Sequence, residues 1–149
     1  EELKEIKSAN VHAVSCTRSN SILGDGLPDL KKWMEIGLKF GLGTDNLMVS
    51  SPDMFREMDY TSRLIRGMNQ NSGVVDSLSI LKSATLNGAQ ALKLDDDLGS
   101  IAKGKLASFM VVDMNSQNLR YCKDRISAIV HRADVHDITS IYIEGEKFK

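Results

Sequence analysis

The segment from Leu38 to Asp45 constrains the fold of this chain more than any other stretch. Its sequence, LKFGLGTD, indicates a short and largely apolar strand that ends on a carboxylate. Helical patterns lie on both sides of it, and α/β enzymes place reacting groups at the carboxyl ends of such strands. Asp45 could therefore bind a metal ion, accept a proton, or cap the turn that follows it. The strand alone leaves these roles open.

The residues before this strand predict a parallel crossover unit. Residues 10–16 are short and rich in small and β-branched residues, as in a buried strand. A long polar loop is expected over residues 17–27, followed by a helix from Pro28 that stops at Gly37. Strand, loop, helix and strand in this order are typical of two parallel strands joined by a right-handed crossover.

Further helices are expected after the strand. Residues 51–53, Ser-Pro-Asp, indicate the start of a helix that ends near residue 68. Ser51 would cap the helix, Pro52 would stand in its first turn, and the negative charge of Asp53 would interact favourably with the helix dipole. Residues at spacings of three and four predict its buried stripe: Met54, Met58, Thr61, Ile65 and Met68. Another helix is expected from about Asp76 to Leu92, with close packing at its internal Gly88.

Beyond residue 93 the pattern becomes β-like. An acidic run at residues 95–97 marks the change. Strands are expected at residues 109–112, 126–130 and 138–143. The sequence Glu144-Gly145-Glu146 predicts a hairpin turn before a last short strand. The chain is therefore divided into an α/β part, residues 1–93, and a β part, residues 94–149.

The composition argues against several classes of protein. Of the 149 residues, 42% are apolar, which suffices for a packed core. The 19 basic residues are balanced by 20 acidic ones and form no basic block that would bind nucleic acid. No signal peptide is visible, and no apolar run approaches the roughly 18 residues of a membrane helix. Cys16 and Cys122 fit no zinc-ribbon spacing and suit a reducing compartment. We expect a cytoplasmic protein that binds neither nucleic acid nor membrane. Because the chain begins inside a helical pattern without Met, we also expect a fragment.

Other local patterns have ordinary explanations. Residues 41–46 match a dinucleotide-binding loop only in part, because Asn46 stands where a third glycine is needed. Ser19 and Asn20 read as turn residues, and Arg18 as a solvated loop arginine that could also bind an anion. A zinc or iron site needs three or four ligands. The histidines form no pair at metal-ligand spacing: His12, His131 and His136.

Six segments of the chain form a recognisable series: residues 15–23 (SCTRSNSIL), 37–45 (GLKFGLGTD), 53–58 (DMFREM), 84–89 (ATLNGA), 99–108 (GSIAKGKLAS) and 141–146 (IYIEGE). In order and in register, they resemble the C-terminal portion of amidohydrolase-superfamily enzymes, in the branch of metal-dependent deaminases and chlorohydrolases. The family's fold is a metal-dependent (β/α)8 barrel with a small β-sandwich built from both chain ends. The resemblance implies an α/β fold in which residues 1–93 hold the last strands and helices of the barrel, with residues 10–16 and 38–43 as strands seven and eight. Residues 94–149 would supply the C-terminal strands of the sandwich.

The resemblance also implies roles for individual residues. Asp45 takes the position of the strand-eight aspartate, which binds the metal and shuttles protons for the attacking water. Ser19 and Asn20 match a substrate-binding segment. Family members often have His-Cys-Pro before this segment, whereas this chain has Ser-Cys-Thr at residues 15–17. The family's metal-binding histidines, on strands one, five and six, would lie before residue 1.

From this resemblance we expect the C-terminal part of a metal-dependent hydrolase of C–N or C–Cl bonds. The favoured reaction is deamination of a small heterocyclic substrate by metal-activated water, with zinc or iron as the metal and Asp45 as ligand and proton shuttle. Two alternatives stay open: a non-catalytic barrel that acts as an assembly scaffold, with Asp45 only a cap, and an inactive truncated fragment. The isolated chain is expected to be inactive and to associate with itself or with the missing N-terminal part of the same protein.

Overall fold

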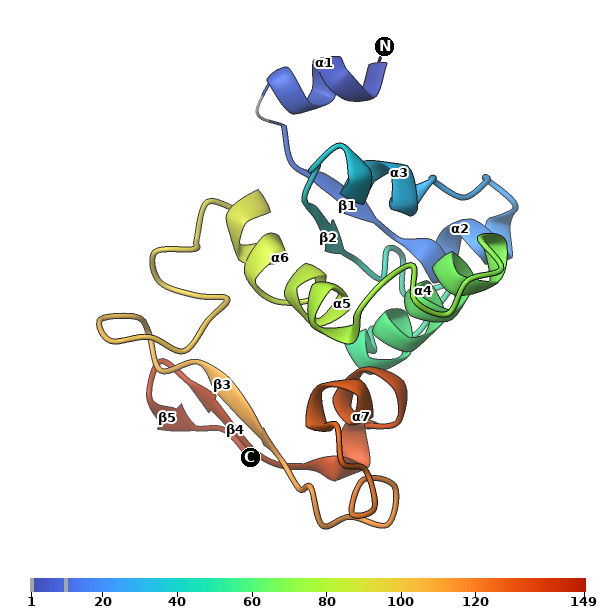
Figure 1. Cartoon of the computed structure of the whole chain (residues 1–149). Coiled ribbons are helices and arrows are strands. Elements are labelled where there is room, and N and C mark those ends of the chain that lie inside the picture. The colour runs from blue at the N-terminus through green and yellow to red at the C-terminus, as the bar shows by residue number, and fades with distance from the viewer. Residues whose placement is uncertain (1, 10) are drawn as a thin grey trace.

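The structure is a mixed α/β fold with two separate sheets (Figure 1). The computed structural model describes residues 2–9 and 11–149, so residue 10 of the expected first strand lies outside the described residues. The first sheet is parallel and consists of β1 (Ala13–Ser15) and β2 (Phe40–Leu42). The second is antiparallel, in the order β3 (Phe109–Val112), β4 (Ile138–Ile143), β5 (Glu146–Lys147). The helices are α1 (Glu2–Ser8), α2 (Thr17–Leu23), α3 (Leu30–Glu35), α4 (Met54–Met68), α5 (Ser77–Ser83), α6 (Leu86–Ala91) and α7 (Arg125–His131), with a 3-10 helix, η1 (Val135–Asp137), before β4.

The parallel sheet carries the strand end that the sequence singles out. Ala13 of β1 lies opposite Phe40 of β2, and the parallel pairing confirms the predicted strand–helix–strand unit. β2 is buried along its whole length, with α5 and α6 packed against it. Gly41 faces the backbone of α6, where a Cβ would lie 3.4 Å from the Cα of Gly88, at van der Waals contact. A Cβ added at Gly88 itself would have no atom of the described residues within 4 Å, so the close packing expected at this glycine is not found.

Residues 17–23 form α2 rather than the predicted loop. Their sequence, TRSNSIL, is too polar to indicate a helix by itself. The helix forms because Thr17 and Ser19 are buried against the rest of the protein and a carboxylate of α4 binds its first turn. Tertiary contacts thus override a weak local preference.

Residues 126–130 are also not the expected strand, because they belong to α7. Asp124 caps this helix, and its Oδ1 accepts the backbone N–H groups of Ile126 and Ser127 at 3.1 and 3.2 Å. A short apolar run does not distinguish a strand from a buried helix, whereas the cap does.

The helix expected over residues 76–92 is interrupted and forms α5 and α6. The backbone of Thr85, with φ −131° and ψ −92°, lies outside the helical region. The Ser83 hydroxyl donates to the Ile80 carbonyl at 2.6 Å and the Thr85 hydroxyl to the Leu81 carbonyl at 2.7 Å. These side chains compete with the helical backbone hydrogen bonds at the break.

Helix α4 lies close to its predicted position but begins later. Its cap is Asp53 rather than Ser51, since the Asp53 carboxylate accepts the backbone N–H groups of Phe55 and Arg56 at 3.0 and 3.2 Å. Met58, Thr61 and Ile65 form the buried stripe, as predicted. Met68 does not belong to it, because the side chain is 57% exposed where the helix ends.

A single hydrophobic core includes residues from before and after position 93. Phe40, Met58 and Ile80 share it with Leu119 and Val130. Helix α7 packs against α4 and α5, and the Ser77 and Ser127 hydroxyls lie 2.9 Å apart across this contact. The division of the chain near residue 93 remains a prediction.

The antiparallel sheet confirms the strands predicted at 109–112 and 138–143. The rings of Phe109 and Tyr142 stack across β3 and β4 with centroids 4.8 Å apart. Glu144 and Gly145, at φ 50° and 90°, form the turn to β5, as the hairpin pattern predicts. Within the part of the chain that the structure describes, no helix has the length and apolar character needed to cross a membrane.

Candidate active site

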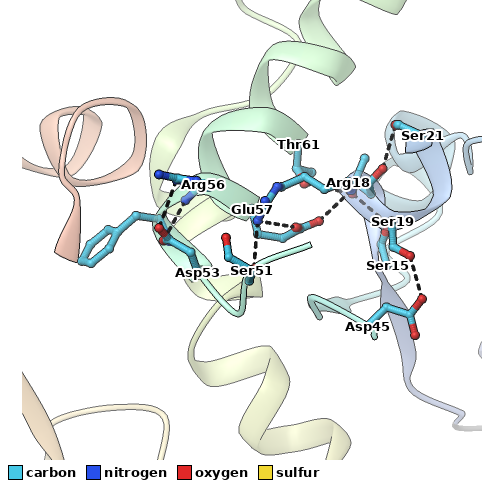
Figure 2. Close-up of polar contacts among 12 residues, drawn as sticks. Ser15, Arg18, Ser19, Ser21, Asp45, Ser51, Asp53, Arg56, Glu57 and Thr61 are labelled. Atoms are coloured by element: carbon cyan, nitrogen blue, oxygen red, sulfur yellow. Dashed lines mark hydrogen bonds and ion pairs between the residues drawn. The ribbon is translucent and has the colours of Figure 1, made fainter. Parts of the chain in front are cut away.

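Asp45 lies just beyond the carboxyl end of β2, where the sequence predicts a reacting group. Its backbone has φ 58°, a left-handed conformation that few residues other than glycine adopt. Gly43 allows the chain to turn closely over β1, because a Cβ there would lie 3.0 Å from Cγ1 of Val14 and 3.1 Å from Sγ of Cys16. The turn brings the Asp45 carboxylate next to the first turn of α2 (Figure 2).

Ser19 binds this carboxylate directly. Its hydroxyl donates a hydrogen bond to Oδ2 of Asp45 at 2.6 Å. Ser19 is buried in the first turn of α2, immediately after β1, whereas Asp45 is exposed. In the described part of the chain no hydrogen bond reaches the second oxygen, Oδ1. One oxygen of Asp45 is thus held by the protein and the other is available to a ligand.

The hydrogen bonds around Asp45 also bear on the capping alternative. The turn that follows it is closed by Asn46, whose Oδ1 accepts the backbone N–H of Met48 at 2.8 Å. Among the described residues, the Asp45 carboxylate accepts its hydrogen bond from Ser19 and not from its own loop. The neighbouring Asn46 therefore performs the capping role that the sequence left open for Asp45.

Asn20 is adjacent to Ser19 but faces a different region. Its backbone carbonyl accepts the N–H groups of Gly24 and Asp25 at 3.0 and 3.1 Å and so ends α2. The residue is half-buried and lines a shallow hollow together with Pro28 and Trp33. The structure gives no hydrogen bond between Asn20 and Asp45 within residues 11–149. Of the two predicted substrate residues, only Ser19 contacts Asp45.

Cys16 lies beside the candidate site as a neutral thiol. Burial raises the pKa of Cys16, and the negative charges of Asp45 and Glu57 raise it further. These effects oppose formation of a thiolate, the form that binds metals and attacks electrophiles. Cys16 and Cys122 are both free cysteines, as expected.

Glu57, a completely buried carboxylate of α4, was not predicted from the sequence. Its Oε1 accepts the backbone N–H of Arg18 at 3.1 Å, and its Oε2 lies 3.8 Å from Nη1 of Arg18 (Figure 2). Arg18 is consequently not a solvated loop residue, because only 16% of its side chain is exposed. Burial raises the pKa of Glu57, although the Arg18 N–H and guanidinium lower it. Its position was a usable signal: Glu57 lies three residues after Met54 and four before Thr61, on the buried face of α4.

A carboxylate such as that of Asp45 can bind a metal ion, but the described residues do not form a metal site by themselves. Within residues 2–9 and 11–149, no group of three His, Cys, Asp or Glu side chains is arranged to hold a metal ion. Zinc sites use three or four protein ligands. One histidine, His131, is already bonded through Nδ1 to Oδ1 of Asp59 at 3.0 Å. Other ligands would have to come from outside these residues.

The sequence model of the amidohydrolase family matches residues 1–147. The chain belongs to the amidohydrolase family. A 5-methylthioadenosine/S-adenosylhomocysteine deaminase of Pyrococcus furiosus is 34% identical over 147 residues, which are 98% of this amidohydrolase chain and 35% of that protein. The chain therefore spans about a third of the length of the curated relatives that it matches.

Solved structures of amidohydrolases have the same fold over this region. An adenosine deaminase from Xanthomonas campestris with bound zinc superposes with a TM-score of 0.94 at 27% identity, over 98% of this chain and 34% of that one. The zinc complex of the atrazine chlorohydrolase TrzN from Arthrobacter aurescens TC1 gives a TM-score of 0.90 over 98% of this chain and 33% of its own. At 17% identity, the second likeness concerns the fold alone.

Proposed function

We propose that this amidohydrolase chain contributes the metal-binding aspartate of a zinc-dependent aminohydrolase acting on adenine nucleosides. The observation that carries the proposal is the geometry of Asp45. Its carboxylate follows a buried parallel strand, is bonded on one oxygen by Ser19, and is exposed. The adenine class comes from the relatives, which are named as deaminases of 5-methylthioadenosine, S-adenosylhomocysteine and adenosine.

The reaction is a hydrolysis in which water adds to the ring carbon that bears the amino group. The C–N bond then breaks and ammonia leaves. When bound, a divalent metal ion makes a water molecule acidic enough to attack at neutral pH. Asp45 would accept one proton of the attacking water and pass it to the leaving nitrogen, while the second proton of the water ends on the ring nitrogen of the product. The Ser19 hydrogen bond keeps the carboxylate in one orientation, and Asn20, in the middle of α2, is a second candidate for contact with the substrate through the hollow that it lines with Pro28 and Trp33. Zinc is the metal in the related structures, and iron is the alternative.

We further propose the place of these residues in the whole protein. β1 and β2 act as strands seven and eight of the barrel, and residues 94–149 supply C-terminal strands of the small sandwich. The remaining metal ligands come from the part of the protein that corresponds to the rest of the relatives' length. This proposal is supported by the family match and by the finding that the described residues contain no group of three side chains arranged to hold a metal ion.

Replacing the carboxylate of Asp45 tests the proposed function. In the full-length protein, Asp45→Asn should lower kcat for 5′-methylthioadenosine and adenosine by about 10²–10⁴ or more, since general acid–base catalysis alone contributes this much. Ammonia release gives the rate, and thermal unfolding shows whether the fold is kept. Asp59→Asn is a matched control on α4, because Asp59 pairs with Arg63 and His131 instead. Retained activity in Asp45→Asn would contradict the assigned role, and an inactive but folded wild type would favour the scaffold alternative.

The metal content of the 149 residues alone tests where the other ligands lie. A chain with one carboxylate ligand should bind less than one zinc ion per molecule and show no turnover. Elemental analysis after dialysis measures the stoichiometry. Tight binding of one zinc per chain that disappears in Asp45→Asn would mean that these residues form a site by themselves.

A further inference from the structure

The first turn of α2 is held by another helix rather than by its own cap. Cys16, which precedes the helix, forms no capping hydrogen bond through its side chain. The buried carboxylate of Glu57 accepts the Arg18 backbone N–H in its place, at 3.1 Å. Because α2 has only 7 residues, it is too short to be stable alone, and its first turn depends on such contacts.

Buried hydroxyl groups form a second link between α4 and α2. The hydroxyl of Thr61 in α4 donates to that of Thr17 at 2.9 Å, and the Thr17 and Ser15 hydroxyls lie 3.1 Å apart. All three residues are buried. Helix α4, the start of α2 and the end of β1 are therefore connected by polar contacts shielded from water, where such contacts are strong.

Arg18 and Ser19 contact the two ends of the loop that carries Asp45. Ser19 donates to the Asp45 carboxylate at 2.6 Å. Nη1 of Arg18 donates to the carbonyl of Ser51 at 3.2 Å, and the same nitrogen lies 3.8 Å from Oε2 of Glu57. Glu57 thus orients both the backbone and the side chain of Arg18 (Figure 2). The loop from Asp45 to Ser51 is fastened at both ends to one turn of helix, and that turn is fastened to Glu57.

From these contacts we propose that Glu57 is a positioning residue, which fixes the first turn of α2 and so holds the Ser19 hydroxyl against the Asp45 carboxylate. The inference rests on the proposed function of Asp45 as base and metal ligand. Glu57 itself touches neither Asp45 nor substrate, and it acts through Arg18 and Ser19. A purely structural role would change stability alone, whereas a positioning role requires that the effect of Glu57 on catalysis pass through Ser19.

A double-mutant cycle in the full-length protein tests this dependence. Glu57→Ala should lower kcat for the adenine nucleoside by about 10- to 100-fold with little change in KM, because small misplacements of catalytic groups cost this much. Ser19→Ala should lower kcat to a similar extent. In the Ser19→Ala background, Glu57→Ala should lower kcat by less than about threefold more, since the link is already broken. If kcat of the double mutant falls by the full product of the two single-mutant factors, Glu57 and Ser19 act independently and the proposal is wrong.

Additional variants separate positioning from a general loss of stability. Glu57→Gln keeps an oxygen that can accept the Arg18 N–H but removes the charge that faces the guanidinium, so its kcat should fall less than that of Glu57→Ala. Asp76→Ala is the stability control, because it removes the cap of α5, which accepts the Ser79 N–H at 2.9 Å, without touching α2. Its kcat should stay within about twofold of wild type. If Asp76→Ala lowers kcat as much as Glu57→Ala at an equal loss of Tm, the positioning role is wrong.

A measurement that does not depend on enzyme turnover tests the positioning role separately from the proposed function. In the metal-free full-length protein, Glu57→Ala should speed hydrogen exchange of the Arg18 amide by about tenfold or more. It should also shift the carboxyl carbon-13 resonance of Asp45 in the same direction as Ser19→Ala does. An unmoved Asp45 resonance would overturn the positioning role, even in an active enzyme. If both substitutions shift the Asp45 resonance in the same direction but the wild-type protein shows no turnover, the proposed function is wrong and the positioning role of Glu57 is retained.

Discussion

At Gly99 the chain passes so close to α6 that a methyl group does not fit. A Cβ there would lie 2.6 Å from the Cβ of Ala89 and 3.0 Å from the Cα of Leu86, and the backbone has φ 82°. Gly99→Ala should therefore lower the free energy of unfolding by about 2–5 kcal/mol. Steric overlap accounts for about 1–3 kcal/mol and the left-handed backbone for about 1–2 kcal/mol. Urea denaturation followed by circular dichroism measures the change.

Gly104 provides the matched control for this clash. It has a similar φ, 95°, but a Cβ there would have no atom within 4 Å. Gly104→Ala should lower the free energy of unfolding only by the cost of the left-handed backbone, about 1–2 kcal/mol. An equal decrease in the free energy of unfolding for the two variants would show that the steric overlap with α6 does not contribute to the effect of Gly99→Ala.

Glu57 should make stability depend on pH in a direction that can be stated in advance. Burial raises the pKa of Glu57 in the folded protein, so the folded state keeps this proton to a higher pH than the unfolded state. As the pH rises above about 4.3, the usual value for an unfolded glutamate, the unfolded chain loses its proton first and the protein becomes easier to unfold. The stability that the raised pKa provides is present below this pH and is lost as the pH rises through the folded pKa.

Comparison with Glu57→Gln isolates this effect from all other titrating groups. The unfolding free energy of Glu57→Gln minus that of wild type should increase with pH through the window and then become constant. The charged or titratable groups facing Glu57 are Arg18 and Cys16, and both stay in the variant. Ser62→Ala, a buried and uncharged change on the same helix, should give a difference independent of pH. A difference that decreases with pH for Glu57→Gln would contradict the raised pKa.

At the scale of elements, the start of α4 depends on one carboxylate. Asp53 accepts the first free N–H groups of the helix through Oδ1, and Asp53→Ala should cost about 1 kcal/mol of stability. Arg56→Ala is the control, since it removes only the ion pair with Asp53 from a side chain that is 68% exposed, and should cost about 0.5 kcal/mol or less. Thermal and urea unfolding of the two variants measure both values. A larger loss in Arg56→Ala would mean that the ion pair, rather than the cap, stabilises this end.

Elements could be predicted from the sequence where the residues that specify them are local. The strand ending before Asp45 and the turn at Glu144 and Gly145 are encoded by neighbouring residues, and both were predicted. Helix α2 was not, because its first turn is bonded by Glu57, which is 39 positions away in sequence. Helix α7 had a local cap at Asp124, but its short apolar run resembles a strand equally well.

The same distinction applies to the candidate site. Asp45 could be singled out because a carboxylate at the end of an apolar strand is a local pattern. Its partner Ser19 lies 26 positions earlier, and only the parallel pairing of β1 with β2 brings the two strand ends together. Taken alone, Ser19 reads as a turn residue, so the local pattern gave no reason to join it to Asp45, and only the family resemblance placed both in one site.

At the scale of the whole molecule, the parallel sheet is short and its edges are open. β1 and β2 have no further strand partner among the described residues. Val14, in β1, is 53% exposed. Unpaired strand edges with exposed apolar side chains promote association. The 149 residues alone should therefore form dimers or larger species at micromolar concentration, and light scattering after size exclusion measures this.

A charge on the strand should weaken that association. Val14→Lys places a charged side chain at the sheet, a device that natural edge strands use against pairing, and should raise the dissociation constant by about tenfold or more. Ile101→Lys is the matched control, because Ile101 is 89% exposed but lies far from β1 in sequence, in the segment before β3. Its dissociation constant should change little. A wild-type chain that remains a monomer, or equal effects of the two substitutions, would show that the open sheet does not direct association.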